Sequence, residues 1–206
     1  MGLAAAVPAW ERDAHLVSQV LLLSGFADAL PPDAEVIARV LAGDTDAFGI
    51  LVRRHEAGLL RFATRMLGSA DAAADAVAEG LTRAYRHLAS LDDPARFRTW
   101  VYRIVANRCK SHLGRRSAQG VSLEEAGPVP DPHDGEAELE RAEQLALVER
   151  ALTTLSAEKR EAFLLKHVEG LSYEEMAAVT GERIPTLKMR VHRAREALLE
   201  ALKEHR

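Results

Sequence analysis

The stretch Ser172-Tyr-Glu-Glu-Met-Ala-Ala-Val-Thr-Gly181, with the helix-forming run that follows it from Pro185, decides the fold of the C-terminal part of this chain. Ser172 and Glu175 have the spacing of a capping box, in which each side chain accepts a hydrogen bond from a free amide at the start of a helix. Gly181 is the residue type that a left-handed helix exit favours. A short helix, a glycine-containing turn and a longer basic helix predict a helix-turn-helix.

The last predicted helix, which runs to about Lys203, divides into a buried stripe and a basic face. The stripe recurs every three or four residues at Leu187, Val191, Ala194 and Leu198. Subtracting it leaves one face that would enter a DNA major groove and contact base edges, made of Lys188, Met189, His192 and Arg193. Three flanking residues would lie beside the phosphates: Thr186, Arg190 and Arg195. A solvated basic helix in a bundle is the alternative explanation of these charges.

The sequence upstream predicts a second helical domain over residues 33–114. Its apolar residues recur at helical spacing and no alternating strand pattern competes with them. Asp44 or Thr45 would cap a long helix that ends at Gly68, and Ser69 would cap the next. Pro94 suits the first turn of a fourth helix, whose inward residues would be Phe97, Trp100, Val101, Ile104 and Val105. The fold class is therefore all-α, with two small helical domains.

Two further segments complete the expected organisation. Residues 115–138 form a linker rich in glycine, proline and acidic residues, and the second domain occupies residues 139–206. Such a linker cannot bury enough apolar surface to fold alone and is expected to be flexible. Residues 1–32 form an apolar leader that ends in Pro31-Pro32 and could be an accessory helix.

The net charge of −4 over 206 residues conceals an uneven charge distribution. Residues 96–116 contain seven basic residues and no acidic one, whereas residues 122–148 contain eight acidic residues and one arginine. A basic stripe beside an acidic linker is compatible with a nucleic-acid binder despite the acidic total.

Several classes of function find no support in the sequence. The single cysteine, Cys109, lies in an apolar helical pattern and is expected to be a buried small hydrophobe. We find no nucleophile–base pairing, no phosphate-binding glycine loop and no metal-ligand cluster, so no catalytic residue, cofactor or metal is expected. The apolar stretch from Leu16 to Leu30 is too short to span a bilayer and makes a poor signal peptide. A cytoplasmic protein that does not bind membranes is expected.

Two sequence stretches together resemble the sigma-70 family of RNA polymerase sigma factors. Residues Glu169 to Gly181, followed by Thr186-Leu-Lys-Met-Arg-Val-His-Arg-Ala-Arg195, look like region 4, which in that family recognises the promoter −35 element. The stretch Thr99-Trp-Val-Tyr-Arg-Ile-Val-Ala-Asn107, preceded by residues 75–85, is similar to region 2. The absence of a region 3 between them is the arrangement of the extracytoplasmic-function (ECF) subgroup.

This resemblance implies a role in transcription initiation and a set of partners. Region 2 would bind the clamp helices of the largest subunit of core RNA polymerase, and region 4 the flap of the second-largest subunit. The implied polymerase-binding residues are Asp75, Ala78 and Glu79. The residues implied to melt and capture the promoter −10 element are Ser90, Asp92, Asp93, Arg96, Arg98, Trp100, Arg103 and Asn107. Promoter DNA and an anti-sigma factor are the other implied partners.

Some positions depart from the family pattern. Ala74 and Ala78 stand where glutamate and glutamine are usual, so the polymerase-facing surface would be less polar than in relatives. Met189 replaces a small polar residue, which puts the usual −35 preference in doubt.

One alternative is a transcriptional regulator that binds an operator through its helix-turn-helix without docking on polymerase. The region 2 resemblance argues against this alternative, because such a regulator has no need of that region. An enzyme is the second alternative, and no constellation of catalytic residues supports it.

Overall fold

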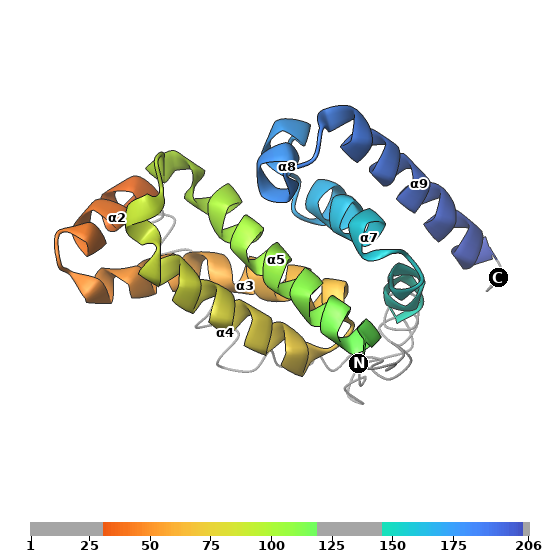
Figure 1. Ribbon diagram of the computed structural model, residues 1–206, viewed down its shortest axis with the longest axis horizontal. Helices are drawn as coiled ribbons and strands as arrows, with labels where there is room; N and C mark the ends of the chain where they lie inside the picture. The colour runs from red at the N-terminus through yellow and green to blue at the C-terminus, as the bar shows by residue number, and fades with distance from the viewer. Residues whose placement is uncertain (1–30, 119–145, 204–206) are drawn as a thin grey trace, which may run out of the picture.

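The computed structural model describes residues 31–118 and 146–203, and every regular element in those two ranges is helical (Figure 1). The first range contains α2 (Asp33–Leu41), α3 (Phe48–Leu67), α4 (Ala70–Arg86) and α5 (Phe97–Ala118). The second contains a helix over 146–153, α7 (Ala157–Phe163), the π-helical turn η5 (Leu164–Val168), α8 (Tyr173–Thr180) and α9 (Ile184–Lys203). Short 3₁₀ turns lie at η2 (Thr45–Ala47), η3 (Leu88–Ser90) and η4 (Pro94–Arg96). The predicted all-α fold class is confirmed. Most of the leader, which could be an accessory helix, and most of the acidic linker lie outside the described residues.

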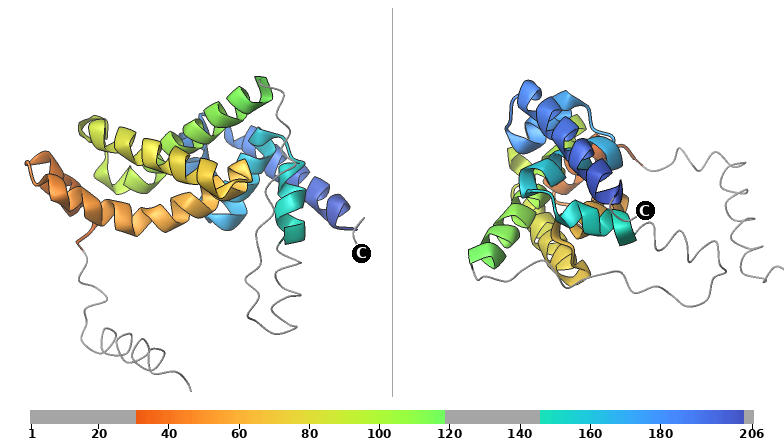
Figure 2. Two further views of the ribbon diagram at one scale, coloured as in Figure 1. Left: turned by 90° about the horizontal axis from the view of Figure 1, so that it is seen from below. Right: turned by 90° about the vertical axis from the view of Figure 1, so that its right-hand side faces the viewer.

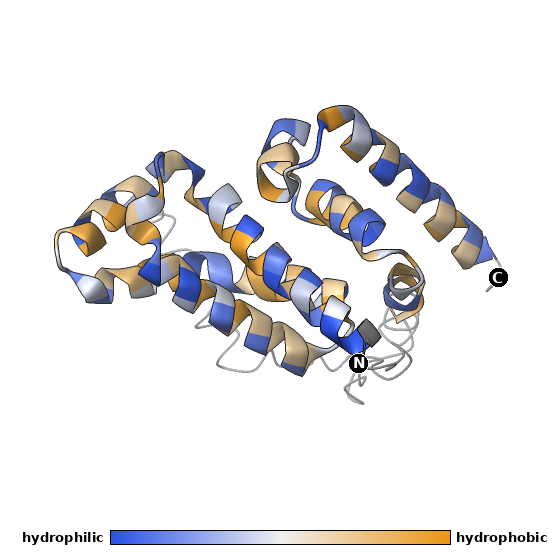
Figure 3. Ribbon diagram, viewed as in Figure 1, coloured by the Kyte–Doolittle hydropathy of each residue, from blue (hydrophilic) through white to orange (hydrophobic). Residues whose placement is uncertain are grey.

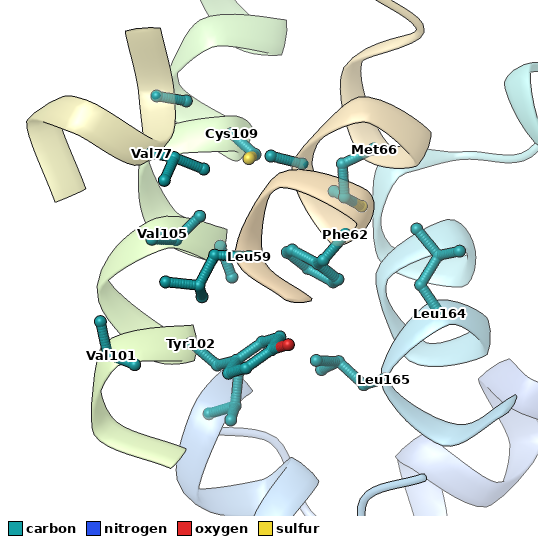
Figure 4. Close-up of a cluster of buried hydrophobic side chains, with 14 of the residues drawn as sticks. Leu59, Phe62, Met66, Val77, Val101, Tyr102, Val105, Cys109, Leu164 and Leu165 are labelled. Atoms are coloured by element: carbon teal, nitrogen blue, oxygen red, sulfur yellow. The ribbon is translucent and has the colours of Figure 1, made fainter. Parts of the chain in front are cut away.

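Helices α3, α4 and α5 pack side by side into a bundle, with α2 across one end (Figure 1). Apolar and polar residues interchange along each helix, as expected for helices that bury one side and expose the other (Figure 3). The core contains Leu59 and Phe62 of α3, Val77 of α4, and Val105 and Cys109 of α5 (Figure 4). Cys109 is fully buried, as predicted, and burial raises the pKa of its thiol to about 12.

The helix ends in this bundle follow some of the predicted signals, although Pro94 begins a 3₁₀ turn ahead of α5 and does not lie in its first turn. Gly68 ends α3 in the left-handed conformation with φ 66°, and the Ser69 hydroxyl accepts a hydrogen bond from the Ala72 amide at 3.3 Å. The predicted capping of α3 by Asp44 or Thr45 is wrong, because the 3₁₀ turn Thr45–Ala47 precedes α3 and places Ala47 at the capping position. The Asp44 carboxylate instead pairs with Arg39 at 2.7 Å, and this guanidinium holds the pKa of Asp44 below its ordinary value.

The C-terminal helices form the predicted helix-turn-helix. The Glu175 amide donates to the Ser172 hydroxyl at 3.1 Å, and the Ser172 amide donates to the Glu175 carboxylate at 2.7 Å, which completes the capping box. Gly181 ends α8 with φ 77°, a left-handed conformation that glycine adopts without steric cost. The buried stripe of α9 consists of the four predicted residues, Leu187, Val191, Ala194 and Leu198.

The two sets of helices also pack directly against each other (Figures 1 and 2). Helix α5 contacts α8, and α3 contacts the π-helical turn η5. This contact was not predicted, since the sequence indicated only two domains and a linker. Helix α5 also continues to Ala118 and so includes the first four residues of the expected linker, which was predicted to start at Arg115.

No helix in the described ranges is long and apolar enough to cross a membrane. In the same ranges, no cluster of three or more histidine, cysteine or acidic side chains could hold a metal ion.

Candidate nucleic-acid interface

The N-terminal half of α9 presents a basic face to solvent. Burial of the opposite stripe leaves four side chains exposed, namely Lys188, Met189, His192 and Arg193. Met189 is 45% exposed, so its apolar side chain is available for a contact. The Lys188 ammonium lies 5.5 Å from the ring centroid of Tyr173, which begins α8. The helix-turn-helix therefore holds all four predicted base-facing residues on one accessible surface.

The flanking residues of α9 differ in how far they are already paired. The Arg190 guanidinium donates to Glu182 at 3.0 Å and is largely covered, while Thr186 is half-buried. Among the described residues, neither Arg193 nor Arg195 has an ion-pair partner, and both are exposed. These two arginines can therefore form new charge-assisted hydrogen bonds without breaking old ones.

Helix α4 exposes the three residues predicted to bind polymerase. Asp75, Ala78 and Glu79 point away from the buried side of this helix, which packs on α3 and α5. The Glu79 carboxylate lies 3.5 Å from the Arg108 guanidinium of α5, and 58% of the Glu79 side chain remains exposed. This α4 surface is accessible, and the small side chain of Ala78 lies between the carboxylates of Asp75 and Glu79.

The segment between α4 and α5 forms an exposed loop built from local hydrogen bonds. Four of the predicted −10 residues lie in it, and all are exposed: Ser90, Asp92, Asp93 and Arg96. The Asp93 carboxylate accepts from the Ala95 amide at 3.0 Å and so caps the turn that leads into α5. Arg96 lies 3.3 Å from the same carboxylate, which moderates its positive charge.

Helix α5 divides the remaining −10 residues between different faces. Arg103 and Asn107 are exposed one turn apart, whereas Trp100 is half-buried with its ring 5.9 Å from that of Phe97. Arg98 points to the second domain, where its guanidinium donates to the Glu169 carbonyl oxygen at 2.7 Å. Arg98 therefore does not share a surface with Arg103 and Asn107 in this arrangement.

Two residues beside Arg98 received no role from sequence reasoning. The Tyr102 hydroxyl donates to the Glu169 carboxylate, and both side chains are buried. Burial and the neighbouring carboxylate both raise the pKa of Tyr102 above its ordinary value. Tyr102 and Glu169 are 67 residues apart in sequence, so no local pattern could have indicated that they meet.

Comparison with known proteins gives the same architecture. The family model for sigma-70 region 2 matches residues 51–119, and the model for sigma-70 region 4 matches residues 145–198. RNA polymerase sigma-H factor of Pseudomonas aeruginosa is 34% identical over 180 residues, which cover 82% of this chain and 93% of that protein. The ECF RNA polymerase sigma-E factor of Escherichia coli K12 is 33% identical over 176 residues, covering 81% and 92% respectively.

Solved structures of similar fold are also sigma factors. The sigma factor RpoE from Bartonella quintana, in complex with the anti-sigma factor NepR, superposes with a TM-score of 0.65 at 30% identity, covering 78% of this chain and 99% of that one. CnrH in complex with the cytosolic domain of CnrY gives a TM-score of 0.63 at 28% identity, covering 84% and 99%.

The chain belongs to the sigma-70 family of RNA polymerase sigma factors. Within this family it is an ECF sigma factor, with regions 2 and 4, that directs transcription initiation by RNA polymerase. Binding to RNA polymerase follows from the family, and the family is not one of enzymes.

Proposed function

We propose that this sigma factor recognises the −35 element through the exposed face of α9. The observation that carries the proposal is the placement of Lys188, Met189, His192 and Arg193 opposite the buried stripe of a helix-turn-helix. Lysine and arginine donate to guanine edges, and a methionine side chain can pack on a thymine methyl group. Thr186, Arg190 and Arg195 flank this face and would contact phosphates.

Region 2 would capture the melted −10 element. The exposed loop from Ser90 to Arg96 offers a site for an unstacked base, and Arg103 and Asn107 lie on the outward face of the following helix. Removing a base from a duplex costs a few kcal/mol, so nearby cations must stabilise the exposed strand. Arg98 and Trp100 would join this site only after rearrangement, since Arg98 now donates to the Glu169 carbonyl oxygen and Trp100 packs on Phe97.

The proposed protein partners are core RNA polymerase and an anti-sigma factor. The α4 face of Asp75, Ala78 and Glu79 would bind the clamp helices of the largest polymerase subunit. Region 4 would bind the flap of the second-largest subunit, which leaves α9 directed at DNA. An anti-sigma factor is a further proposed partner, because the similar sigma factor RpoE was solved in complex with the anti-sigma factor NepR. A cytoplasmic location would follow from these partners.

Site-specific photo-crosslinking in the polymerase–promoter complex tests these assignments. A photoreactive amino acid replaces Met189 in one protein and Asn107 in another. We expect the first to crosslink to the −35 element and the second to the −10 element. Leu199, which is 51% exposed on the C-terminal half of α9, is the control position and should give no DNA crosslink. Crosslinks at Leu199 but not at Met189 would overturn the proposed orientation of α9.

A further inference from the structure

Tyr173 contacts both the hydrophobic core and one of the base-facing residues of α9. It is the first residue of α8, it is half-buried, and its side chain packs against the core. The ammonium group of Lys188, which is exposed on α9, lies over this ring at 5.5 Å from the centroid. One aromatic side chain therefore joins the interior of the helix-turn-helix to its predicted DNA-binding face.

The position of the Tyr173 ring is fixed from two sides. The capping box of Ser172 and Glu175 sets the start of α8, and the Tyr173 backbone lies directly inside it. The Lys166 ammonium lies over the same ring at 4.8 Å from the centroid and donates to the Leu171 carbonyl oxygen at 3.1 Å. These contacts restrict the ring on the side of the protein and leave it to Lys188 on the other helix.

Lys188, in contrast, has few other contacts that could order its side chain. Apart from the ring, no hydrogen bond or ion pair joins it to another of the described residues. A lysine ammonium is a point charge on a flexible four-carbon stem, which loses much rotamer freedom when it is fixed. A cation over the face of a tyrosine is attracted by the quadrupole of the ring. The ring thus orders the Lys188 ammonium before any DNA is bound.

We propose that Tyr173 is a positioning residue for recognition of the −35 element, and that its ring directs the Lys188 ammonium to one base pair. A lysine without this support could donate to acceptors on neighbouring base pairs, because it lacks the rigid fork of an arginine. The ring therefore increases discrimination between sequences, and it lowers the ordering cost of binding. The proposal rests on the proposed function, since Lys188 must face the bases for its position to matter.

A direct contact between the Tyr173 hydroxyl and a DNA phosphate would be a different role. Such a contact would strengthen binding to all sequences about equally, because phosphates carry no sequence information. Two variants separate the roles. Tyr173→Phe keeps the aromatic face and removes the hydroxyl, whereas Tyr173→Leu removes both.

The measurement is binding of the polymerase–sigma complex to promoters altered at single −35 positions. Lys188→Ala first identifies the base pair at which Lys188 discriminates. At this base pair we expect Tyr173→Leu to lose about two- to fivefold in discrimination, the size of one exposed cation–π contact. Tyr173→Phe should keep the wild-type value. In the Lys188→Ala background, Tyr173→Leu should cause no further loss.

Phe163→Leu is the matched control for removing an aromatic ring from region 4. The Phe163 ring lies 4.9 Å from that of His167, and no lysine lies over it among the described residues. Its discrimination at the Lys188 base pair should equal that of the wild type. Circular dichroism identifies any variant that has lost helix content.

Nuclear magnetic resonance of the wild-type chain tests the contact without any risk of misfolding. Protons above an aromatic face are shifted upfield by the ring current, so we expect upfield signals for the Lys188 methylene group next to the ammonium. Lys188→Ala assigns these signals by their absence. The same signals should persist in Tyr173→Phe and move to their ordinary position in Tyr173→Leu.

The outcomes separate this proposal from the proposed function. Unshifted Lys188 signals in the wild type overturn the proposal, as do full discrimination in folded Tyr173→Leu and an equal loss in Tyr173→Phe. If Lys188→Ala leaves the preference unchanged at every −35 position, the proposed DNA-binding face fails, and the ring-current shift shows separately whether Tyr173 contacts Lys188.

Discussion

At the scale of single residues, the proposed DNA contacts depend on a few arginines, some of which are exposed and some of which are already hydrogen-bonded within the protein. Arg193 and Arg195 of α9 are exposed and have no ion-pair partner among the described residues, while Arg190 is engaged by Glu182. Arg98 of α5 is engaged by Glu169 of the other domain. Arg193 and Arg195 can therefore contact DNA directly, whereas Arg98 and Arg190 must first break their present hydrogen bonds.

Lys188→Ala and Arg193→Ala should each reduce promoter discrimination by about 1–3 kcal/mol, because each removes a donor to a base edge. The measurement is polymerase-dependent binding to promoters altered at single −35 positions. Arg195→Ala is the control, since loss of a phosphate contact weakens binding about equally on all sequences. Unchanged sequence preference in both base-facing variants would contradict the assignment of α9 to the groove.

At the scale of elements, two features of α4 can be tested: its close packing against α5 and its exposed acidic face. Gly80 of α4 lies against α5, and a Cβ atom placed there would lie 2.7 Å from Val105 Cγ2. Gly114 of α5 has no atom within 4 Å of such a Cβ. Both glycines are helical, so they form a matched pair.

Gly80→Ala should lower the free energy of unfolding by about 1–3 kcal/mol, because overpacking outweighs the better helix propensity of alanine. Gly114→Ala should raise it by about 0.5–1 kcal/mol, since only the propensity changes. Chemical denaturation followed by circular dichroism measures both. Stabilisation by Gly80→Ala would show that α4 and α5 are not so close.

Replacing Asp75 and Glu79 together with lysine should weaken binding to core polymerase by about tenfold or more, because the acidic face of α4 would become basic. Fluorescence anisotropy of the labelled sigma factor measures the affinity. The double variant Asp46→Lys, Glu56→Lys is the control, because it makes the same change in charge at exposed positions outside α4. An equal loss in both proteins would remove α4 as the specific docking face.

Local signals in the sequence account for most of the elements. The Ser172–Glu175 capping box, the Gly181 exit and the α9 stripe all follow from short-range spacing, and all are confirmed. Asp44 illustrates the limit, because its competing partner Arg39 lies five residues away and captures the carboxylate that would have capped α3. Tyr85 of α4 is an aromatic residue whose burial would also depend on distant neighbours; it is 41% exposed and meets Phe48 only at an edge.

At the scale of the whole molecule, the contact between domains could not be predicted. Its polar bonds join residues 51 to 94 positions apart, such as Lys110 with Glu161 and Arg160 with Met66. Periodicity identifies which face of a helix is apolar, but it does not say which distant element will cover that face. The exposure of the α9 surface was predictable for the opposite reason, since it depends only on the stripe within the same helix.

The interface should also respond to pH through Glu161. Burial raises the pKa of this carboxyl, while Lys110 of α5 and Arg190 of α9 oppose the rise and Glu158 of α7 adds to it. A raised pKa means that the folded chain, in which Glu161 is buried, binds the proton more tightly than the unfolded chain, so stability falls as pH rises through that pKa. The Lys110 side chain is 31% exposed, which lets its charge remain partly hydrated when the partner is neutral.

Glu161→Gln should therefore raise the thermal midpoint relative to the wild type at pH 8, and the difference should shrink as the pH falls toward 5. Thermal unfolding across this pH range measures the effect. Glu174→Gln, which changes an exposed carboxyl, should show no such trend. A difference that grows on acidification would mean that the ionised carboxylate stabilises the interface.

Transcription in vitro with purified core RNA polymerase and a genomic DNA library tests the central claim most directly. The account predicts that adding this protein produces initiation at discrete start sites, with upstream sequences shared at both the −35 and −10 positions, and that core polymerase alone does not use these sites. Failure of the protein to bind core polymerase, or start sites unchanged by its presence, would contradict the account.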